Sequence, residues 1–374
     1  ITVLLVVIAV GTNCKGSDRI KRQVLKDNFG LNTTWRGAIP YAFNTTDPIV
    51  LKMFKMGVEV WTEVTCIDFV ENKAAKDKVV VVKEDDCSSS VGRVGGDQPL
   101  SLNERSTEGA AVHEIGHALG LFHTMQRFDR DNYIKLLVQN IDPAEMEEFR
   151  KLGLGIADVH NLTYDYGSVM HYDQTGCSIN QQPTIMATDS RYQKTMGSGI
   201  ISYSDIFMIN EHYQCNARCN KSTSAKCSND GYPHPRNCSI CICPGGYGGV
   251  LCDRRPPGCG DDLVATKVEK LIAISFGLGI GLRDQFMFCH YMITAPQGKK
   301  VEVHVQSISG GYDEPGCYKG GVEIKSQKDQ RLTGVRFCSK RGTGVPVVAS
   351  SNRLPVIFFN RLGTMEATLK YRYI

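Results

Sequence analysis

Three histidines and a glutamate occur in one short segment of the sequence, HEIGHALGLFH, which covers residues 113–123. On a helix, residues four apart lie on one face with their Cβ atoms about 5–6 Å apart, so His113 and His117 can both bind one Zn²⁺. Gly120 can adopt the positive φ that ends a helix and turns the chain, which brings His123 round as a third ligand. Because three imidazoles leave coordination positions open, the pattern predicts a catalytic rather than a structural zinc site.

Glu114 follows the first of these ligands directly, so its carboxylate is expected beside the metal without binding it. A carboxylate in that place can take a proton from water and deliver it to a leaving amine, while zinc polarises the scissile carbonyl. We therefore predict that Glu114 is the general base of a hydrolase. The alternative interpretation is a helix with incidental histidines. The probability that this pattern of five residues occurs by chance anywhere in the chain is on the order of 10⁻⁵. The five residues are His113, Glu114, His117, Gly120 and His123.

A second motif, Ser168-Val169-Met170-His171-Tyr172, follows the first. With Arg127 and the DRD run at 129–131, the two motifs resemble the zinc signature and Met-turn of the astacin family within the metzincins. The resemblance implies an α+β metzincin catalytic domain with a long zinc-binding helix, one zinc ion per subunit and zinc metalloendopeptidase activity. It also implies that Met170 lies beneath the metal and that Tyr172 is a further zinc ligand, which swings away to donate a hydrogen bond to the oxyanion. Without the resemblance, Met170 is a core methionine and Tyr172 an aromatic residue at the end of a strand.

Two helices must position these motifs, and the spacing of apolar residues locates them. A helix over residues 48–64 has one apolar face at spacings of three and four, made by Val50, Met53, Phe54, Val58 and Trp61. A second helix is expected over about residues 107–119 and carries the first two histidines. Short strand-like runs, such as AIPYAF and KVVVVKE, lie between and before them.

The composition changes along the chain indicate several domains. The opening run, ITVLLVVIAV, has the size of the core of a secretory signal peptide, and the basic tetrad that ends at Arg22 resembles a convertase site. The alternative for this tetrad is a solvated charge cluster. In the C-terminal part, valines alternate with polar residues, which predicts an antiparallel β-sandwich. The expected divisions are a truncated signal peptide at 1–11, a short prosegment at 12–22, a peptidase domain at 23–215, a small cysteine-dense module at 216–255 and a β-domain at 259–374.

Fifteen cysteines fit an exported protein, because disulfides persist outside the cytosol. The cysteine-dense module resembles an EGF-like module and the β-domain, with Cys259, Cys289, Cys317 and Cys338, resembles an all-β CUB sandwich; this domain order is similar to that of many nematode astacins. The resemblance implies that Cys66 and Cys215 close the peptidase domain, and that the EGF-like pairs are Cys219–Cys238, Cys227–Cys241 and Cys243–Cys252. Without Cys14, which leaves with the prosegment, Cys87 and Cys177 remain. We predict that they pair, although a sequence alone does not fix connectivity.

The sequence also departs from the astacin pattern. Astacins generally have a glutamate after the third histidine, which interacts with the mature N-terminus, but this chain has Thr124. The usual partner of Cys87 is replaced by Arg105. The CUB-like part lacks the aspartate that commonly binds calcium shortly after its third cysteine, so calcium is not expected as a cofactor.

The bulk properties narrow the range of partners. A net charge of +4 without a run of like charges gives no reason to expect nucleic acid as a partner. No segment is long and apolar enough to predict a membrane span. We expect a secreted, extracellular protein with protein or peptide substrates and a matrix or cuticle protein bound by the CUB-like domain. Five sequons permit N-glycosylation, at Asn32, Asn44, Asn161, Asn220 and Asn237.

Two functions are compatible with this sequence. One is a secreted endopeptidase that cuts extracellular, matrix or cuticle proteins. The other is a catalytically inactive astacin-like protein that binds or adheres through its EGF-like and CUB-like domains. The first is favoured because the three histidines, Glu114, Met170 and Tyr172 are all present.

Overall fold

The computed structural model describes residues 7–9, 33–153, 159–310, 313–340 and 342–374. The expected signal peptide and prosegment, Arg22 and Asn32 therefore lie outside the described residues, apart from the backbone of a three-residue strand. The chain divides into two compact units. Unit 1 contains Ile1–Tyr164, Ser168–Thr188 and Gly199–Arg218, and unit 2 contains Asp165–Gly167, Asp189–Ser198 and Cys219–Ile374.

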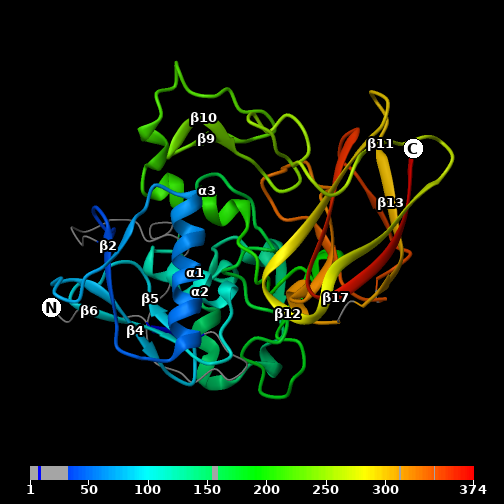
Figure 1. The fold of residues 1–374 in the computed structure, drawn as a ribbon. Coiled ribbons are helices and arrows are strands. Elements are labelled where there is room, and N and C mark those ends of the chain that lie inside the picture. Colours follow the sequence, from blue (N-terminus) through cyan, green and yellow to red (C-terminus); the bar gives the residue numbers. More distant parts are fainter. Residues whose placement is uncertain (1–6, 10–32, 154–158, 311–312, 341) are drawn as a thin grey trace. The chain divides into compact units, whose positions relative to one another are not determined.

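Unit 1 is an α+β fold on a mixed six-stranded sheet of order β1-β5-β6-β4-β2-β3 (Figure 1). Strands β3, β2, β4 and β6 pair in parallel, whereas β5 and β1 are antiparallel to their neighbours. The strands are β1 (Val7–Ala9), β2 (Ile39–Phe43), β3 (Phe69–Glu71), β4 (Lys78–Lys83), β5 (Ser88–Ser90) and β6 (Asp97–Leu102), with a separate pair β7 (Ile134–Leu136) and β8 (Ile185–Ala187). The helices are α1 (Pro48–Val64), α2 (Glu108–Ala118) and α3 (Tyr203–His212), with 3₁₀ turns η1 (Thr124–Gln126), η2 (Arg130–Asn132), η3 (Val138–Asn140), η4 (Pro143–Phe149) and η6 (Cys215–Arg218).

Both expected helices form close to their predicted bounds. Helix α1 begins after Asp47, whose side chain caps two backbone N–H groups, and it buries four of the five predicted apolar residues, Val58 being only half-buried. Helix α2 begins after the cap Thr107 and is buried along almost its whole length. The two helices pack closely at Gly57 of α1, where a Cβ atom would lie 2.9 Å from the side chain of Ile115. This packing fixes α2 in the core of unit 1.

Unit 2 contains the cysteine-dense segment and an all-β C-terminal domain. The segment has one hairpin, β9 (Tyr232–His234) with β10 (Asn237–Ile242). In the C-terminal domain, β17 pairs with β14 through its first half and with β13 through its second half, and Val301, Val303 and Val305 lie in the core. Its strands are β11 (Asp262–Val264), β12 (Lys270–Thr294), β13 (Val301–Ser309), β14 (Gly320–Ile324), β15 (Val335–Phe337), β16 (Pro346–Val348) and β17 (Arg353–Tyr373), and unit 2 also has the turns η5 (Ser190–Tyr192) and η7 (Pro315–Cys317).

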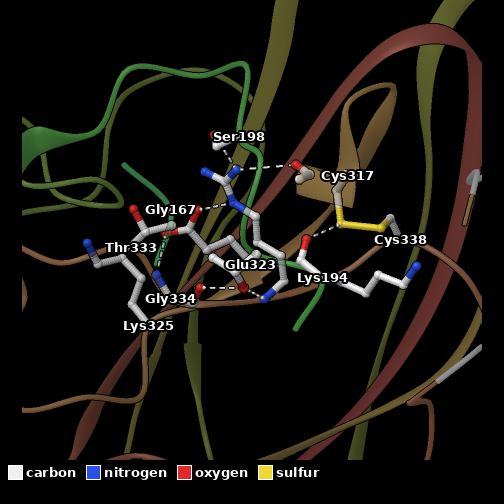
Figure 2. Close-up of polar contacts among 12 residues, drawn as sticks. Gly167, Lys194, Ser198, Cys317, Glu323, Lys325, Thr333, Gly334 and Cys338 are labelled. Carbon is white, nitrogen blue, oxygen red and sulfur yellow. Dashed lines mark hydrogen bonds and ion pairs between the residues drawn. A yellow bond between two sulfur atoms is a disulfide. The ribbon is translucent and has the colours of Figure 1, made fainter. Parts of the chain in front are cut away.

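Two segments from the middle of the sequence belong to unit 2 and are bound there by a buried polar network (Figure 2). The backbone N–H of Thr333 donates to Asp165 Oδ1 over 3.1 Å. Arg336 Nη1 donates to Ser198 Oγ over 2.7 Å, and Arg336 Nε pairs with Glu323 at 3.0 Å. The segments Asp165–Gly167 and Asp189–Ser198 are therefore integral to the same compact unit as the C-terminal β-domain.

Six disulfides join described cysteines to one another, and they include every pair that the family resemblance implied. They are Cys66–Cys215, Cys219–Cys238, Cys227–Cys241, Cys243–Cys252, Cys259–Cys289 and Cys317–Cys338.

The predicted bond between Cys87 and Cys177 is wrong. Cys87 is a free, buried thiol whose Sγ lies 3.2 Å from Ser106 Oγ, close to the N-terminus of α2. Cys177 is disulfide-bonded, and its partner is not Cys87, because the Cys87 thiol is free. A small buried thiol packs like an apolar residue and needs no covalent partner, so a count of the remaining cysteines does not fix their pairing.

Candidate metal centre

The three predicted histidines converge on one point in the core of unit 1. The Nε2 atoms of His113 and His117 each lie 3.2 Å from Nε2 of His123, and all three side chains are buried. A tetrahedral zinc ion with Zn–N distances of about 2.0–2.1 Å needs ligand nitrogens about 3.3–3.4 Å apart. Among the described residues, this is the one group of histidine, cysteine or acidic side chains with metal-binding geometry. The donors thus fit zinc both in kind and in spacing.

Backbone carbonyls orient the first two imidazoles. Nδ1 of His113 lies 2.7 Å from the carbonyl oxygen of Val169, and Nδ1 of His117 lies 2.7 Å from that of Leu121. A carbonyl can only accept, so Nδ1 carries the proton and the lone pair of Nε2 faces the centre. Burial lowers the pKa of His113 to about 4, which keeps this imidazole neutral as ligation requires.

A glycine turn brings in the third histidine. Gly120 has φ of 108°, and its N–H and that of Leu121 close the end of α2 by donating to the carbonyls of His117 and Gly116. The chain then reverses into His123, as the sequence predicted. A side chain at Gly120 would be strained at this φ, so a β-branched or bulky residue there would displace His123 from the cluster.

Glu114 lies in the same helix, fully buried, and neither of its carboxylate oxygens has a hydrogen-bond partner among the described residues. Burial raises the pKa of this carboxyl well above its usual value. A buried carboxyl without partners is costly to the fold and is therefore typical of a functional position. Its predicted role as a base beside the metal stays a prediction.

The Met-turn packs directly against α2. Met170 is fully buried, and a Cβ atom on Gly116 would lie only 2.9 Å from Met170 Sδ, so only glycine allows this approach. Thr124, which replaces the usual glutamate, is also buried, and its N–H donates to the carbonyl of Met170 over 3.0 Å. Thr124 therefore joins the third histidine to the Met-turn.

Asp205 of α3 also holds the Met-turn, a role that the sequence did not reveal. It accepts from Ser168 Oγ over 2.6 Å and from the N–H of Val169 over 2.9 Å. The same carboxylate forms a capping box with Ser202 at the start of α3. The S-x-x-D spacing could have revealed the cap, but not the contact with the turn.

Tyr172 lies against the third histidine. The centroid of its ring is 4.3 Å from that of His123, and its hydroxyl donates to Glu148 Oε2 over 3.3 Å. Burial raises the pKa of this phenol well above its usual value. The tyrosine is therefore a protonated hydrogen-bond donor beside the histidine cluster. No pattern in the sequence singled out Glu148, which is one of several glutamates in η4.

A buried helix with two histidines, a glycine turn to a third and a methionine turn beneath them define the catalytic unit of a metallopeptidase. Residues 28–214 match the family model described as Astacin, a family of peptidases. The chain belongs to the astacin family.

Proteins of Caenorhabditis elegans are similar to this chain over nearly its whole length, and a solved structure is similar over about half of it. Zinc metalloproteinase nas-31 of Caenorhabditis elegans is 42% identical over 366 residues, which are 97% of this chain and 60% of that protein. Zinc metalloproteinase nas-25 of the same organism is 35% identical and covers 94% of this chain, which in turn spans 90% of nas-25. Among solved structures, the hatching enzyme zinc-protease high choriolytic enzyme 1 of Oryzias latipes is 29% identical, with a TM-score of 0.47, over 51% of this chain and 98% of its own.

Proposed function

We propose that the protein is a secreted zinc-dependent metalloendopeptidase that hydrolyses peptide bonds of extracellular, matrix or cuticle proteins. The observation that carries the proposal is the convergence of three Nε2 atoms, two of them from the helix that also carries the buried, unpartnered carboxylate of Glu114. Membership of a peptidase family and the names of the C. elegans relatives support it.

The residues divide the chemistry between them. His113, His117 and His123 would hold one zinc ion, which when bound polarises the scissile carbonyl and acidifies water. Glu114 takes the proton of the attacking water and passes it to the leaving amine. Tyr172, as a protonated phenol beside His123, donates a hydrogen bond to the oxyanion of the tetrahedral intermediate.

Several features support an extracellular location and the proposed domain order. Six disulfides are typical of proteins outside the cytosol, and the four described sequon asparagines, Asn44, Asn161, Asn220 and Asn237, are exposed. Within the described residues, none of the helices has the length and apolar character needed to cross a bilayer. We assign residues 23–215 to the peptidase domain, 216–255 to an EGF-like module and 259–374 to a CUB-like domain that binds a matrix or cuticle protein.

Hydrolysis of a quenched fluorescent peptide library by the chain beginning at Gln23 separates an enzyme from an inactive binding protein. We expect cleavage that a zinc chelator abolishes and added zinc restores. If the zinc-loaded protein cleaves none of the peptides but still binds extracellular matrix, it functions as an inactive binding protein.

A further inference from the structure

Glu148 of η4 is a buried carboxylate at the edge of the histidine cluster. Its side chain contacts two members of the site through one atom, because Glu148 Oε2 accepts from the Tyr172 hydroxyl over 3.3 Å and lies 3.8 Å from His123 Nδ1. The residue is only 7% exposed. Its neighbour Glu147 is exposed and pairs with Arg150 at 3.5 Å. The two glutamates therefore differ in burial and in what they touch.

The backbone around Glu148 is attached to the segment that follows His123. The carbonyl oxygen of Phe149 accepts from Arg130 Nη1 over 2.6 Å, and the N–H of Leu152 donates to Gln126 over 2.8 Å. The ring of Phe149 also packs edge-on against Tyr172, with centroids 6.0 Å apart. These contacts hold η4 in place, so the carboxylate is presented from a fixed backbone.

The three histidines are supported differently at Nδ1. His113 and His117 are oriented by backbone carbonyls at 2.7 Å, whereas Nδ1 of His123 lies near the Glu148 carboxylate. Carboxylates commonly take this outer role for metal-binding histidines, where they fix the ring and make it a stronger ligand. At 3.8 Å the two atoms are beyond the distance of a direct hydrogen bond, so such a bond requires a rotation of the Glu148 side chain.

We propose that Glu148 is a positioning residue that orients His123 and holds the Tyr172 hydroxyl, so that one carboxylate couples the third zinc ligand to the switching tyrosine. The proposal rests on the proposed function, since it needs zinc at the histidine cluster. Thr124 replaces the glutamate that astacins generally have after the third histidine. The carboxylate of Glu148 supplies a negative charge next to this segment. When Tyr172 leaves Glu148, the same oxygen is released to accept from His123.

Zinc affinity tests the first half of the proposal without measuring activity. The dissociation constant is determined for the metal-free full chain by competition with a fluorescent zinc chelator. Loss of an outer-shell carboxylate commonly weakens metal binding about 10–100-fold, so we expect an increase of that size for Glu148→Ala and a smaller one for Glu148→Gln. Glu147→Gln, the exposed control, should leave the constant unchanged. A Glu148→Ala protein that binds zinc like the control overturns the orientation of His123.

A double-mutant cycle with Tyr172→Phe tests the coupling to the tyrosine. We expect Glu148→Gln, which keeps the shape of the side chain, to lower kcat with little change in KM in the wild-type background, and to have a clearly smaller effect when Tyr172 is already Phe. If the two substitutions lower kcat by independent factors that multiply in the double variant, the proposed coupling between Glu148 and Tyr172 is wrong. Thermal unfolding of the metal-free forms shows whether each variant folds, and the isosteric Gln variant remains informative if Ala does not. A wild-type chain that binds no zinc and cleaves no peptide refutes the proposed function itself, whereas an active wild type with unaffected Glu148 variants refutes only this inference.

Discussion

In both units, loss of contact with water shifts the pKa of certain ionisable residues toward the neutral form, and His290 of unit 2 is only half-buried. Glu114 and Tyr172 in unit 1 have raised pKa values, while His290 in unit 2 has a pKa lowered to about 4. In unit 1 these shifts belong to groups to which we assign a role in the proposed chemistry. His290 is part of strand β12 and lies next to Phe288, with ring centroids 6.1 Å apart, and it belongs to no catalytic motif of the sequence. Its effect is therefore on stability.

His290 should make the fold sensitive to mild acid. Burial lowers its folded pKa to about 4, below the ordinary value of 6.5, so the unfolded chain binds the proton more tightly. Its contribution is fully present above pH 6.5 and is lost as the pH falls toward 4. Between about pH 7 and pH 5 the wild type should lose about 1–2 kcal/mol more unfolding free energy than His290→Gln, measured by urea denaturation. Equal losses in the two proteins would contradict this origin.

At the level of elements, the Met-turn depends on helix α3 as much as on α2. Asp205 caps α3 and binds both Ser168 and Val169, so it fixes the end of one element to the turn of another. Asp47 caps α1 in the same way, but its further side-chain contact is an ion pair with the exposed Lys83.

Replacement of Asp205 should therefore cost more than replacement of an ordinary cap. Asp205→Ala leaves Ser168 and the N–H of Val169 without their buried acceptor, so we expect a loss of about 2–4 kcal/mol in unfolding free energy and weaker zinc retention. Asp47→Ala should cost about 1 kcal/mol and leave zinc retention unchanged. Thermal unfolding and metal analysis after dialysis measure both effects. If the two variants behave alike, Asp205 acts only as a cap.

The sequence predicted the elements whose signals are local. The apolar spacing located α1 and α2, and Gly120 explained the turn to His123. Contacts between distant segments could not be read in this way. Asp205 reaches the Met-turn from α3 and Glu148 reaches Tyr172 from η4, and neither contact has a periodic or motif signal. The error at Cys87 has the same cause, because pairing depends on which segments meet in the fold.

At the scale of the whole molecule, charged residues are buried in unit 2 where segments from the peptidase sequence pack with the C-terminal β-domain. Arg336 and Glu323 are 4% and 7% exposed, and Asp165 is 4% exposed. Gly167 is needed there because a Cβ atom would lie 2.3 Å from Thr333. Since Asp165–Gly167 directly precede the Met-turn in the chain, we expect the β-domain to affect the stability of the peptidase part.

Arg336→Met tests this dependence. It leaves Glu323 buried without its cationic partner, which typically costs about 3–5 kcal/mol. We expect a lower midpoint of thermal unfolding for the full chain and faster loss of activity on heating. Arg336→Met combined with Glu323→Leu should recover part of the stability, because neither charge then remains buried. A single variant as stable as the wild type would show that the network contributes nothing.

The central claim is that Glu114 is the general base beside zinc held by three histidines, and the rate of peptide hydrolysis by Glu114→Gln at full zinc occupancy tests it most directly. Gln keeps the shape of the side chain but cannot take a proton, so the account predicts a decrease in kcat of about 10²–10⁴-fold or more with one zinc still bound, and no change for Glu147→Gln. Cleavage by Glu114→Gln at the wild-type rate, with the same zinc content, would contradict it.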